Sequence, residues 1–277
     1  MPLKLMYITN KPQVALIAQK YGVDRVWVDL ETLGKEERQK NLDCVKSHHT
    51  VSDVEKLSKI LTTSELMVRV NPWNENSYEE IEQVINAGAQ IIMLPMWKTT
   101  KEVELFLDAV GGRCKTSLLL ETKEGEEIID QVLAGKLPDE MHIGLNDLHL
   151  SKGMTFMFEL LANGTVEKLC KKIKAAGIPY GFGGIAKIGQ GDLPAEKVIT
   201  EHYRLGSTRA ILSRSFCNTD LITDEKEIEE VFSSNMRSLR EFEQSLTSLT
   251  EEDFSNNALS VKESVQTIVT KIKEKRK

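Results

Sequence analysis

Short apolar runs alternate with amphipathic stretches along most of the chain. The apolar runs have the length and composition of buried strands, and they span residues 3–8, 25–31, 66–72, 89–96, 116–121, 140–147, 178–184 and 207–215. The intervening stretches place apolar residues at helical spacing and predict helices at 12–22, 51–61, 77–88, 101–110, 126–135, 194–206 and 222–246. A longer helical region, broken near Asn163 and Gly164, precedes the run at 178–184. The chain is therefore predicted to contain eight strand–helix units.

Strands that alternate with helices and are apolar throughout are typical of a parallel sheet covered on both faces. Eight such units within about 250 residues predict an α/β protein with a closed (β/α)8 fold, the TIM barrel. A doubly wound open sheet is the alternative. The first predicted strand is not followed by the GxGxxG turn of dinucleotide-binding sheets, so the barrel is favoured.

The last part of the chain lies outside the eight units. We predict a barrel domain at residues 1–247 and a C-terminal helical extension at 248–277. An apolar stripe near helical spacing runs along this extension, formed by Leu259, Val261, Val265, Ile268, Val269 and Ile272. The stripe predicts a helix to about Ile272 that packs on its own barrel or on a neighbouring subunit. A frayed and solvated end is the alternative, because the final residues are strongly charged.

Composition narrows the classes of partner. The formal net charge is −6, so the chain has no basic footprint for nucleic acid or an anionic membrane surface. The four cysteines form no CxxC pair and are expected to be reduced thiols of a cytoplasmic protein. No signal-peptide pattern is apparent, and no apolar run approaches the roughly 20 residues of a membrane span. We therefore expect a cytoplasmic homo-oligomer that acts on a small molecule.

Two of the apolar runs end in a carboxylate. Glu121 closes the run at 116–121, and Asp147 closes the run at 140–147. Consecutive parallel strands lie about 4.8 Å apart, so we expect these side chains to share one divalent cation. Carboxylate oxygens suit Mg²⁺ or Mn²⁺, which usually keep several waters and complete their shell with substrate. The alternative is that each carboxylate caps a helix.

Further polar side chains follow other predicted strands, at the end of a (β/α)8 barrel where active sites lie. The candidates are Asp29, Glu31, Arg69, Asn71, Asn146, Ser213 and Arg214, together with a glycine cluster that includes Gly183 and Gly184. An arginine among several carboxylates indicates a site for an anionic, metal-chelating substrate. Arg69 is expected to bind that anion, and its alternative role is a salt bridge to Glu31 or Asp29.

Five segments together resemble a known family. They are DLE (29–31), VRVNP (68–72), MLPMW (93–97), LLLETKEG (118–125) and IGLNDLHLSKG (143–153). In this order and spacing they are similar to the citrate lyase β-subunit and metal-dependent 2-keto acid aldolase family, over about residues 1–215. The resemblance implies a (β/α)8 barrel that makes or breaks carbon–carbon bonds. It also implies a pyruvate, oxaloacetate or CoA-thioester substrate and bound Mg²⁺ or a similar ion.

The resemblance assigns the metal and the anion to particular residues. Glu121 and Asp147 match the two metal ligands. Arg69 matches the arginine that binds the substrate carboxylate or the developing enolate oxygen. These residue types suit the chemistry, because a divalent cation acts as a Lewis acid on a 2-oxo acid and a guanidinium stabilises developing negative charge.

The resemblance also implies how protons are handled. Asp29 and Glu31 match acidic residues that orient waters or the catalytic base. Aldolases of this family often place a histidine just before the helix that follows strand two, and His49, beside His48, stands at that position. An imidazole is well suited to proton transfer near neutral pH. The alternative is a surface histidine pair in a long loop.

Two departures from the family pattern leave the substrate open. Met96 follows Pro95 where many citrate-lyase-like members have a lysine, which weakens the case for a CoA or citrate substrate. The connection between Thr32 and His49 also differs from the compact continuation of relatives. Separately, the glycine-rich turn at 181–194, assisted by Arg214, is either a phosphate-binding loop or simply a tight turn.

We therefore predict a divalent-metal-dependent carbon–carbon lyase, of the aldolase or citrate-lyase type. It is expected to act through an enolate on a 2-oxo acid or an acyl thioester. A thioester hydrolase or a phosphoenolpyruvate-type enzyme on the same barrel is one alternative. A non-catalytic ligand-binding barrel subunit is another, motivated by Met96 and by the unassigned base.

Overall fold

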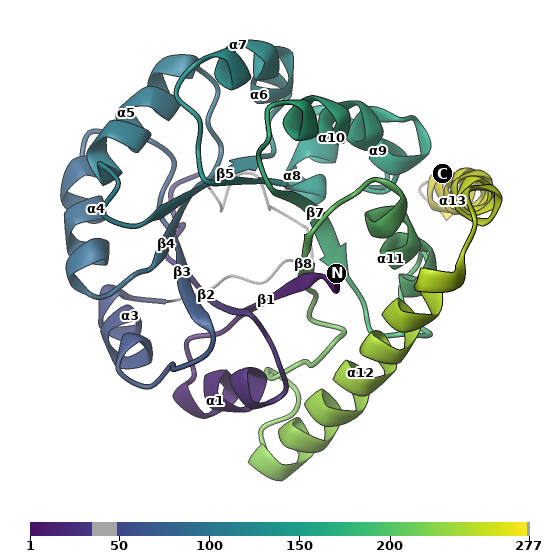
Figure 1. Ribbon diagram of the computed structural model, residues 1–277, viewed down its shortest axis with the longest axis horizontal. Helices are drawn as coiled ribbons and strands as arrows, with labels where there is room; N and C mark the ends of the chain where they lie inside the picture. The colour runs from purple at the N-terminus through teal and green to yellow at the C-terminus, as the bar shows by residue number, and fades with distance from the viewer. Residues whose placement is uncertain (35–48, 276–277) are drawn as a thin grey trace.

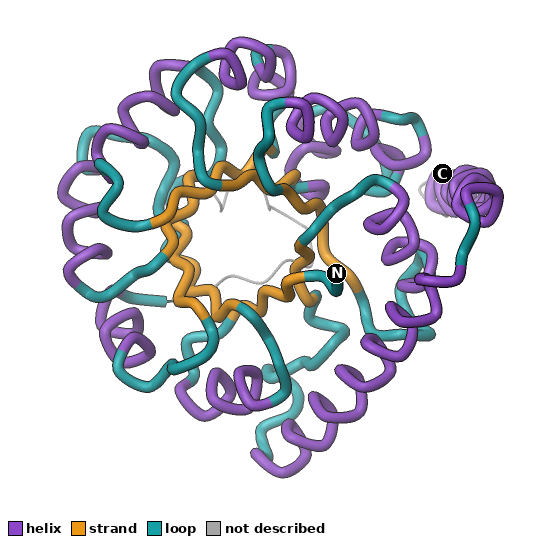
Figure 2. Tube along the Cα trace, viewed as in Figure 1, coloured by secondary structure: helices purple, strands orange, loops and turns teal. Residues whose placement is uncertain are grey.

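A closed parallel barrel of eight strands forms the centre of the molecule, in the order in which the strands follow one another along the chain. The computed structural model describes residues 1–34 and 49–275. Figure 2 shows the strands as a ring enclosed by helices. The strands are β1 (Lys4–Ile8), β2 (Arg25–Asp29), β3 (Glu65–Arg69), β4 (Ile91–Leu94), β5 (Lys115–Leu120), β6 (Glu140–Ile143), β7 (Tyr180–Ile185) and β8 (Arg209–Leu212). The predicted (β/α)8 barrel is confirmed.

Helices cover the outside of the barrel, as Figure 1 shows. Along the first half of the chain they are α1 (Pro12–Lys20), α3 (Val51–Ser58), α4 (Ser77–Asn86), α5 (Thr100–Val110), α6 (Lys123–Glu127) and α7 (Ile129–Ala134). Along the second half they are α8 (Leu145–Ser151), α9 (Glu159–Ala162), α10 (Thr165–Ala175), α11 (Ala195–Arg204), α12 (Glu225–Ser245) and α13 (Glu251–Lys275). A short 3₁₀ turn at Leu246–Ser248 joins the last two.

The structure differs from the predicted elements at two places that matter here. The helix predicted at 126–135 is two short helices, α6 and α7, which meet at Ile128. The strand predicted at 140–147 ends at Ile143, and α8 begins at Leu145. The expected break near Asn163 is present, between α9 and α10.

Two apolar clusters stabilise the barrel. The smaller cluster consists only of strand residues and therefore fills the inside of the ring: Met6, Trp27, Met67, Ile91, Met93 and Leu119. The larger cluster joins the outer strand faces to the helices. Because each strand is buried on both faces, its sequence appears as a continuous apolar run rather than an alternating one.

The C-terminal helix α13 packs on the barrel of its own chain. It lies against α9 and α11 (Figure 1). Val261 and Val265 of α13 are buried. Asn257 donates to the Lys197 carbonyl at 3.1 Å and to Glu201 Oε1 at 2.9 Å, which fixes the start of α13 on α11. The predicted apolar stripe therefore packs against helices of its own chain. The domain boundary between residues 247 and 248 stays a prediction. Among the described helices, none combines the length and apolarity needed to span a membrane.

Candidate functional site

The C-terminal ends of β2 and β3 bring a buried acid and an arginine together. Asp29 and Arg69 are partners in the strand register. The Arg69 guanidinium donates from Nε to Asp29 Oδ1 at 2.8 Å and from Nη2 to Asp29 Oδ2 at 2.9 Å, a bidentate pair. Glu31 Oε2 lies 3.3 Å from the same Nη2. The salt bridges considered as the alternative role of Arg69 are therefore present.

The environment of Arg69 keeps it charged and held in place. Burial by itself lowers the pKa of the Arg69 guanidinium, but the charges of Asp29 and Glu31 outweigh it and raise that pKa above its ordinary value. The guanidinium also lies over the ring of Trp27, 5.1 Å from its centroid, within the range of a cation–π contact. Arg69 is thus a fixed positive charge at the mouth of the barrel, the end at which the C-terminal ends of the strands meet.

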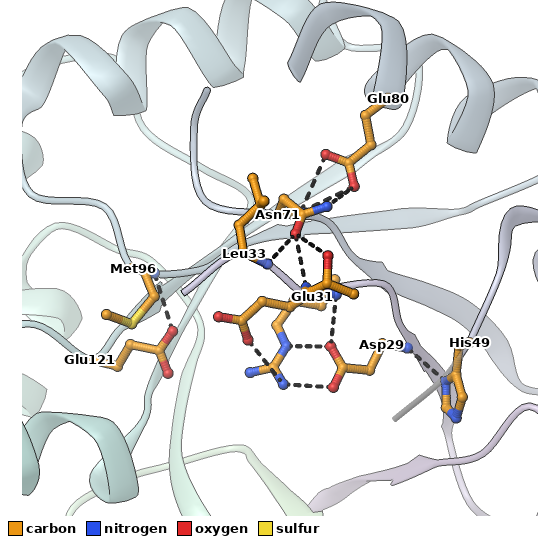
Figure 3. Close-up of polar contacts among 10 residues, drawn as sticks. Asp29, Glu31, Leu33, His49, Asn71, Glu80, Met96 and Glu121 are labelled. Carbon is orange, nitrogen blue, oxygen red and sulfur yellow. Dashed lines mark hydrogen bonds and ion pairs between the residues drawn. The ribbon is translucent and has the colours of Figure 1, made fainter. Parts of the chain in front are cut away.

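Glu121 lies at the same mouth, directly after β5, and is buried (Figure 3). Its Oε1 accepts a hydrogen bond of 3.1 Å from the backbone N–H of Met96. Burial, and next the charge of Asp147, raise the pKa of Glu121 well above its ordinary value; Arg69 opposes this and Glu31 adds to it. The carboxylates predicted as metal ligands are therefore close enough to repel one another.

Asp147 reaches this place by a different route from the predicted one. It lies in the first turn of α8 and not at the end of β6, because the strand stops at Ile143 and the helix starts two residues later. The N-cap of α8 is Gly144, and no side chain caps this helix end. The placement of Asp147 on a strand is therefore wrong. Its charge acts on the Glu121 carboxyl, and its role as the second metal ligand stays a prediction.

The donor set at the mouth fits a hard divalent cation. Glu121 and Asp147 offer carboxylate oxygens, the ligands that Mg²⁺ and Mn²⁺ prefer, and a cation between them would relieve their mutual repulsion. Gly144 leaves room for the Glu121 carboxylate, because a Cβ at this position would lie 2.8 Å from Glu121 Oε2. Within residues 1–34 and 49–275, no three His, Cys, Asp or Glu side chains form a complete metal cage. Two protein ligands with waters and substrate are usual for Mg²⁺.

The long connection after β2 returns to the mouth at His49. The backbone N–H of Asp29 donates to His49 Nδ1 at 3.0 Å (Figure 3). A neutral imidazole that accepts at Nδ1 carries its proton on Nε2. His49 therefore contacts the backbone of Asp29, the partner of Arg69, and its catalytic role stays a prediction. His48 falls outside the described residues.

Two other histidines, His142 and His149, make their contacts elsewhere in the barrel. His142 is buried, and its Nε2 is 3.0 Å from the carbonyl oxygen of Gly183. His149 is buried within α8, with Nδ1 3.2 Å from the Leu145 carbonyl oxygen. Both rings therefore have partners within the fold.

Asn71 contacts protein groups on both sides of its amide. Its Oδ1 accepts from the backbone N–H groups of Thr32 at 2.9 Å and Leu33 at 3.0 Å. Its Nδ2 donates to Glu80 Oε1 at 2.8 Å. A substrate contact by Asn71 stays a prediction. Sequence reasoning missed Glu80, whose only signal was an acidic residue in the first turn of the helix after the VRVNP segment.

The glycine-rich strand β7 shows the close approach expected of a tight turn. Gly183 has φ +52, and a Cβ there would lie 2.7 Å from a Leu145 side-chain carbon of α8. The register of β7 against β8 shifts between Gly181 and Gly184. Arg214 is exposed in the turn after β8. Phosphate binding by Gly183, Gly184 and Arg214 remains a prediction.

A sequence model described as HpcH/HpaI aldolase/citrate lyase matches residues 4–156, more than half of the chain. The chain belongs to this family. The matched part contains every residue of the carboxylate and arginine cluster, from Asp29 to Asp147. Family membership supports a lyase-type enzyme function. The family is generally dependent on divalent metals.

Solved structures share the barrel of this HpcH/HpaI family member. An HpcH/HpaI aldolase from Desulfitobacterium hafniense is 14% identical with a TM-score of 0.60, over 76% of this chain and 86% of that one. The citrate synthase SbnG is 17% identical with a TM-score of 0.57, over 88% of this chain and 95% of that one. At these identities the likeness shows the fold. A comparison with the curated proteins gave no match.

Proposed function

We propose that this family member is a Mg²⁺- or Mn²⁺-dependent carbon–carbon lyase that cleaves a 2-oxo acid through an enolate. The supporting observation is the carboxylate pair at the mouth: Glu121 is buried, Asp147 is half-buried, and the pKa of Glu121 is raised because it is desolvated and lies near the charge of Asp147. A divalent cation bound by both would offset that repulsion. It would also supply Lewis-acid polarisation of the substrate ketone.

Arg69 is assigned to the negative charge that develops on the substrate. When the carbon–carbon bond breaks, its electron pair moves into the enolate, and the charge appears on the former keto oxygen. A guanidinium held by Asp29 and Glu31 needs no reorganisation to stabilise that charge. Its planar fork also suits a substrate carboxylate.

Cleavage of a 4-hydroxy-2-oxo acid removes the proton of its hydroxyl group, which becomes the carbonyl of the released fragment, and the enolate carbon then gains a proton. With Nδ1 accepting from the Asp29 N–H, neutral His49 carries its proton on Nε2 and acts as a hydrogen-bond donor. The ring takes up a proton at Nδ1 only after its contact with the Asp29 N–H opens. We therefore assign His49 to proton transfer coupled to the opening of this contact.

The metal assignment is tested by the double variant Glu121→Gln/Asp147→Asn. We expect loss of Mn²⁺ binding in calorimetry while the circular dichroism spectrum and the melting transition are kept. We also expect loss of pyruvate release from 4-hydroxy-2-oxo acids or oxaloacetate, measured by coupling to lactate dehydrogenase. Unchanged Mn²⁺ affinity in the double variant would remove the assignment.

The role assigned to Arg69 is tested in the same assay by Arg69→Lys. Arg69→Lys keeps the charge and loses the fork, so we expect weaker pyruvate binding and slower turnover, by about tenfold or more for a lost charge-assisted contact.

Hydrolysis of an acyl thioester or turnover of phosphoenolpyruvate, without cleavage of any oxo acid, would favour a different reaction on this barrel. Metal binding without any turnover would favour a ligand-binding subunit.

A further inference from the structure

The first residues after β2 are tied to the loop after β3 by one side-chain amide. Asn71 Oδ1 accepts from two consecutive backbone N–H groups, of Thr32 at 2.9 Å and of Leu33 at 3.0 Å. The Thr32 hydroxyl lies 3.3 Å from the same oxygen. Figure 3 shows these contacts converging on the side-chain oxygen Oδ1 of Asn71. The backbone directly after Glu31 is therefore held by Asn71.

Glu80 determines which way the Asn71 amide points. Its Oε1 accepts from Asn71 Nδ2 at 2.8 Å, and both carboxylate oxygens lie within 3.3 Å of the Asn71 backbone nitrogen. A carboxylate accepts hydrogen bonds, whereas backbone N–H groups donate them. The oxygen of the amide thus faces two donors, and its nitrogen faces an acceptor. A flipped amide would place its NH₂ group against the backbone N–H groups and its oxygen against the carboxylate.

This chain of contacts leads to the proposed anion site. Thr32 follows Glu31, and Glu31 Oε2 lies 3.3 Å from the Arg69 guanidinium. We propose that Glu80 is a positioning residue: through Asn71 it fixes the backbone after β2 so that Glu31 stays against Arg69 in the arrangement that binds the substrate anion. This role rests on the proposed function of Arg69.

Glu80 lies on α4, which belongs to the unit of β3, whereas Glu31 follows β2. The link therefore joins two neighbouring units at the mouth of the barrel. Side chains that orient metal ligands typically change metal affinity or activity by about 10–100-fold when they are removed, and we expect an effect of that order for Glu80. A purely structural role in α4 would lower stability without this effect on the mouth.

The test uses an exchange of partners between the two positions. Asn71→Asp places a carboxylate against Glu80 and removes the donor, so we expect faster amide exchange at Thr32 and Leu33. In Asn71→Asp/Glu80→Gln the glutamine amide donates to the new carboxylate, which still accepts from both N–H groups. We expect this double variant to recover most of the protection that Asn71→Asp loses.

Function is followed in the same proteins by the affinity for oxalate, an analogue of the pyruvate enolate, in the presence of Mg²⁺. We expect Glu80→Ala and Asn71→Asp to weaken oxalate binding and to lower kcat/KM by about tenfold or more, with rescue in the double variant. Glu79→Ala is the matched control, because Glu79 is the exposed neighbour on the same helix. It is expected to leave exchange, affinity and turnover unchanged.

Three outcomes overturn the positioning role alone. The first is unchanged exchange at Thr32 and Leu33 in Glu80→Ala, and the second is faster exchange with unchanged oxalate affinity. The third is a loss of oxalate affinity that the double variant fails to rescue. A wild-type protein that binds neither Mg²⁺ nor oxalate overturns the proposed function, and the positioning role with it. The exchange data distinguish these cases, because they do not depend on catalysis.

Discussion

At the scale of single residues, the candidate site depends on how closely the backbone approaches the Glu121 carboxylate. Gly144 caps α8 with an ordinary φ of −81, so its backbone conformation accepts any residue. A Cβ at this position would nevertheless lie 2.8 Å from both the Cβ and the Oε2 of Glu121. Glycine is needed here for space rather than for conformation.

Gly144→Ala is therefore expected to displace the Glu121 carboxylate and weaken Mn²⁺ binding by about tenfold or more, as for other changes beside a ligand. Calorimetric titration with Mn²⁺ measures the effect. Gly135→Ala is the control, because the nearest atom to an added Cβ there is the Val132 carbonyl oxygen at 3.6 Å, an ordinary contact. Equal Mn²⁺ affinity in the two variants would place the metal away from Glu121.

The sequence predicted the charge pair at the mouth more reliably than the role of each polar residue. Asp29 and Arg69 end neighbouring strands, and parallel register brings such residues together. Asp147 was misplaced because Ile143 and Leu145 continue an apolar run in which periodicity cannot separate a short strand from the start of a helix. The partners of Asn71 were not predictable, because they depend on a loop and a helix from different units.

At the scale of elements, the strands carry charges at both ends. Their first residues include Arg25 of β2, Glu65 of β3, Glu140 of β6 and Arg209 of β8. Arg25 donates to both oxygens of Glu140, at 2.6 and 2.7 Å, and from Nε to Glu65 at 3.1 Å. Both Arg25 and Glu140 are buried. This network was not predicted, because its charges stand at the starts of strands that lie far apart along the chain.

Arg25→Met is expected to destabilise the barrel by about 3–5 kcal/mol, because it leaves the buried Glu140 charge without its main partner. Mn²⁺ and oxalate affinities should be unchanged, since the site lies at the other end of the strands. Urea unfolding and calorimetry measure the two effects. Arg25→Met/Glu140→Gln should recover part of the loss, and Lys136→Met, which breaks the exposed pair with Asp108, should change stability by less than about 1 kcal/mol.

At the scale of the whole molecule, the strand–helix period was enough to predict a closed eight-stranded barrel. The exact ends of some helices, and the surface against which the last helix packs, were not predictable because tertiary packing decides them. One predicted helix became α6 and α7, and the apolar stripe of the C-terminal segment could not by itself select its own barrel over a neighbour. Contacts from Asn257 to α11, which no periodicity reveals, select its own barrel in this structure.

Two buried histidines make the stability of the molecule depend on pH. Burial, with the charges of Arg209 and Arg25 adding to it, lowers the pKa of His142 to about 3. Burial and the nearby His142 lower the pKa of His202 to about 3. In the unfolded chain both have a pKa near 6.5. Between these values the unfolded state binds more protons, so the free energy of unfolding falls as the pH decreases.

His202→Gln tests this dependence, because glutamine can still pair with the Ser207 hydroxyl, which lies 2.8 Å from His202 Nδ1. Urea unfolding of both proteins at pH 5.0, 5.5 and 6.0 gives the slope of stability against pH. We expect the variant slope to be shallower by about 1 kcal/mol per pH unit, close to the limit of about 1.4 for one proton. Ser207→Ala perturbs the same contact without removing a titrating group, so it should lower stability by a similar amount at each pH. A variant slope equal to that of the wild type would mean that His202 is already protonated in the folded molecule at pH 5–6, or stays neutral in both states.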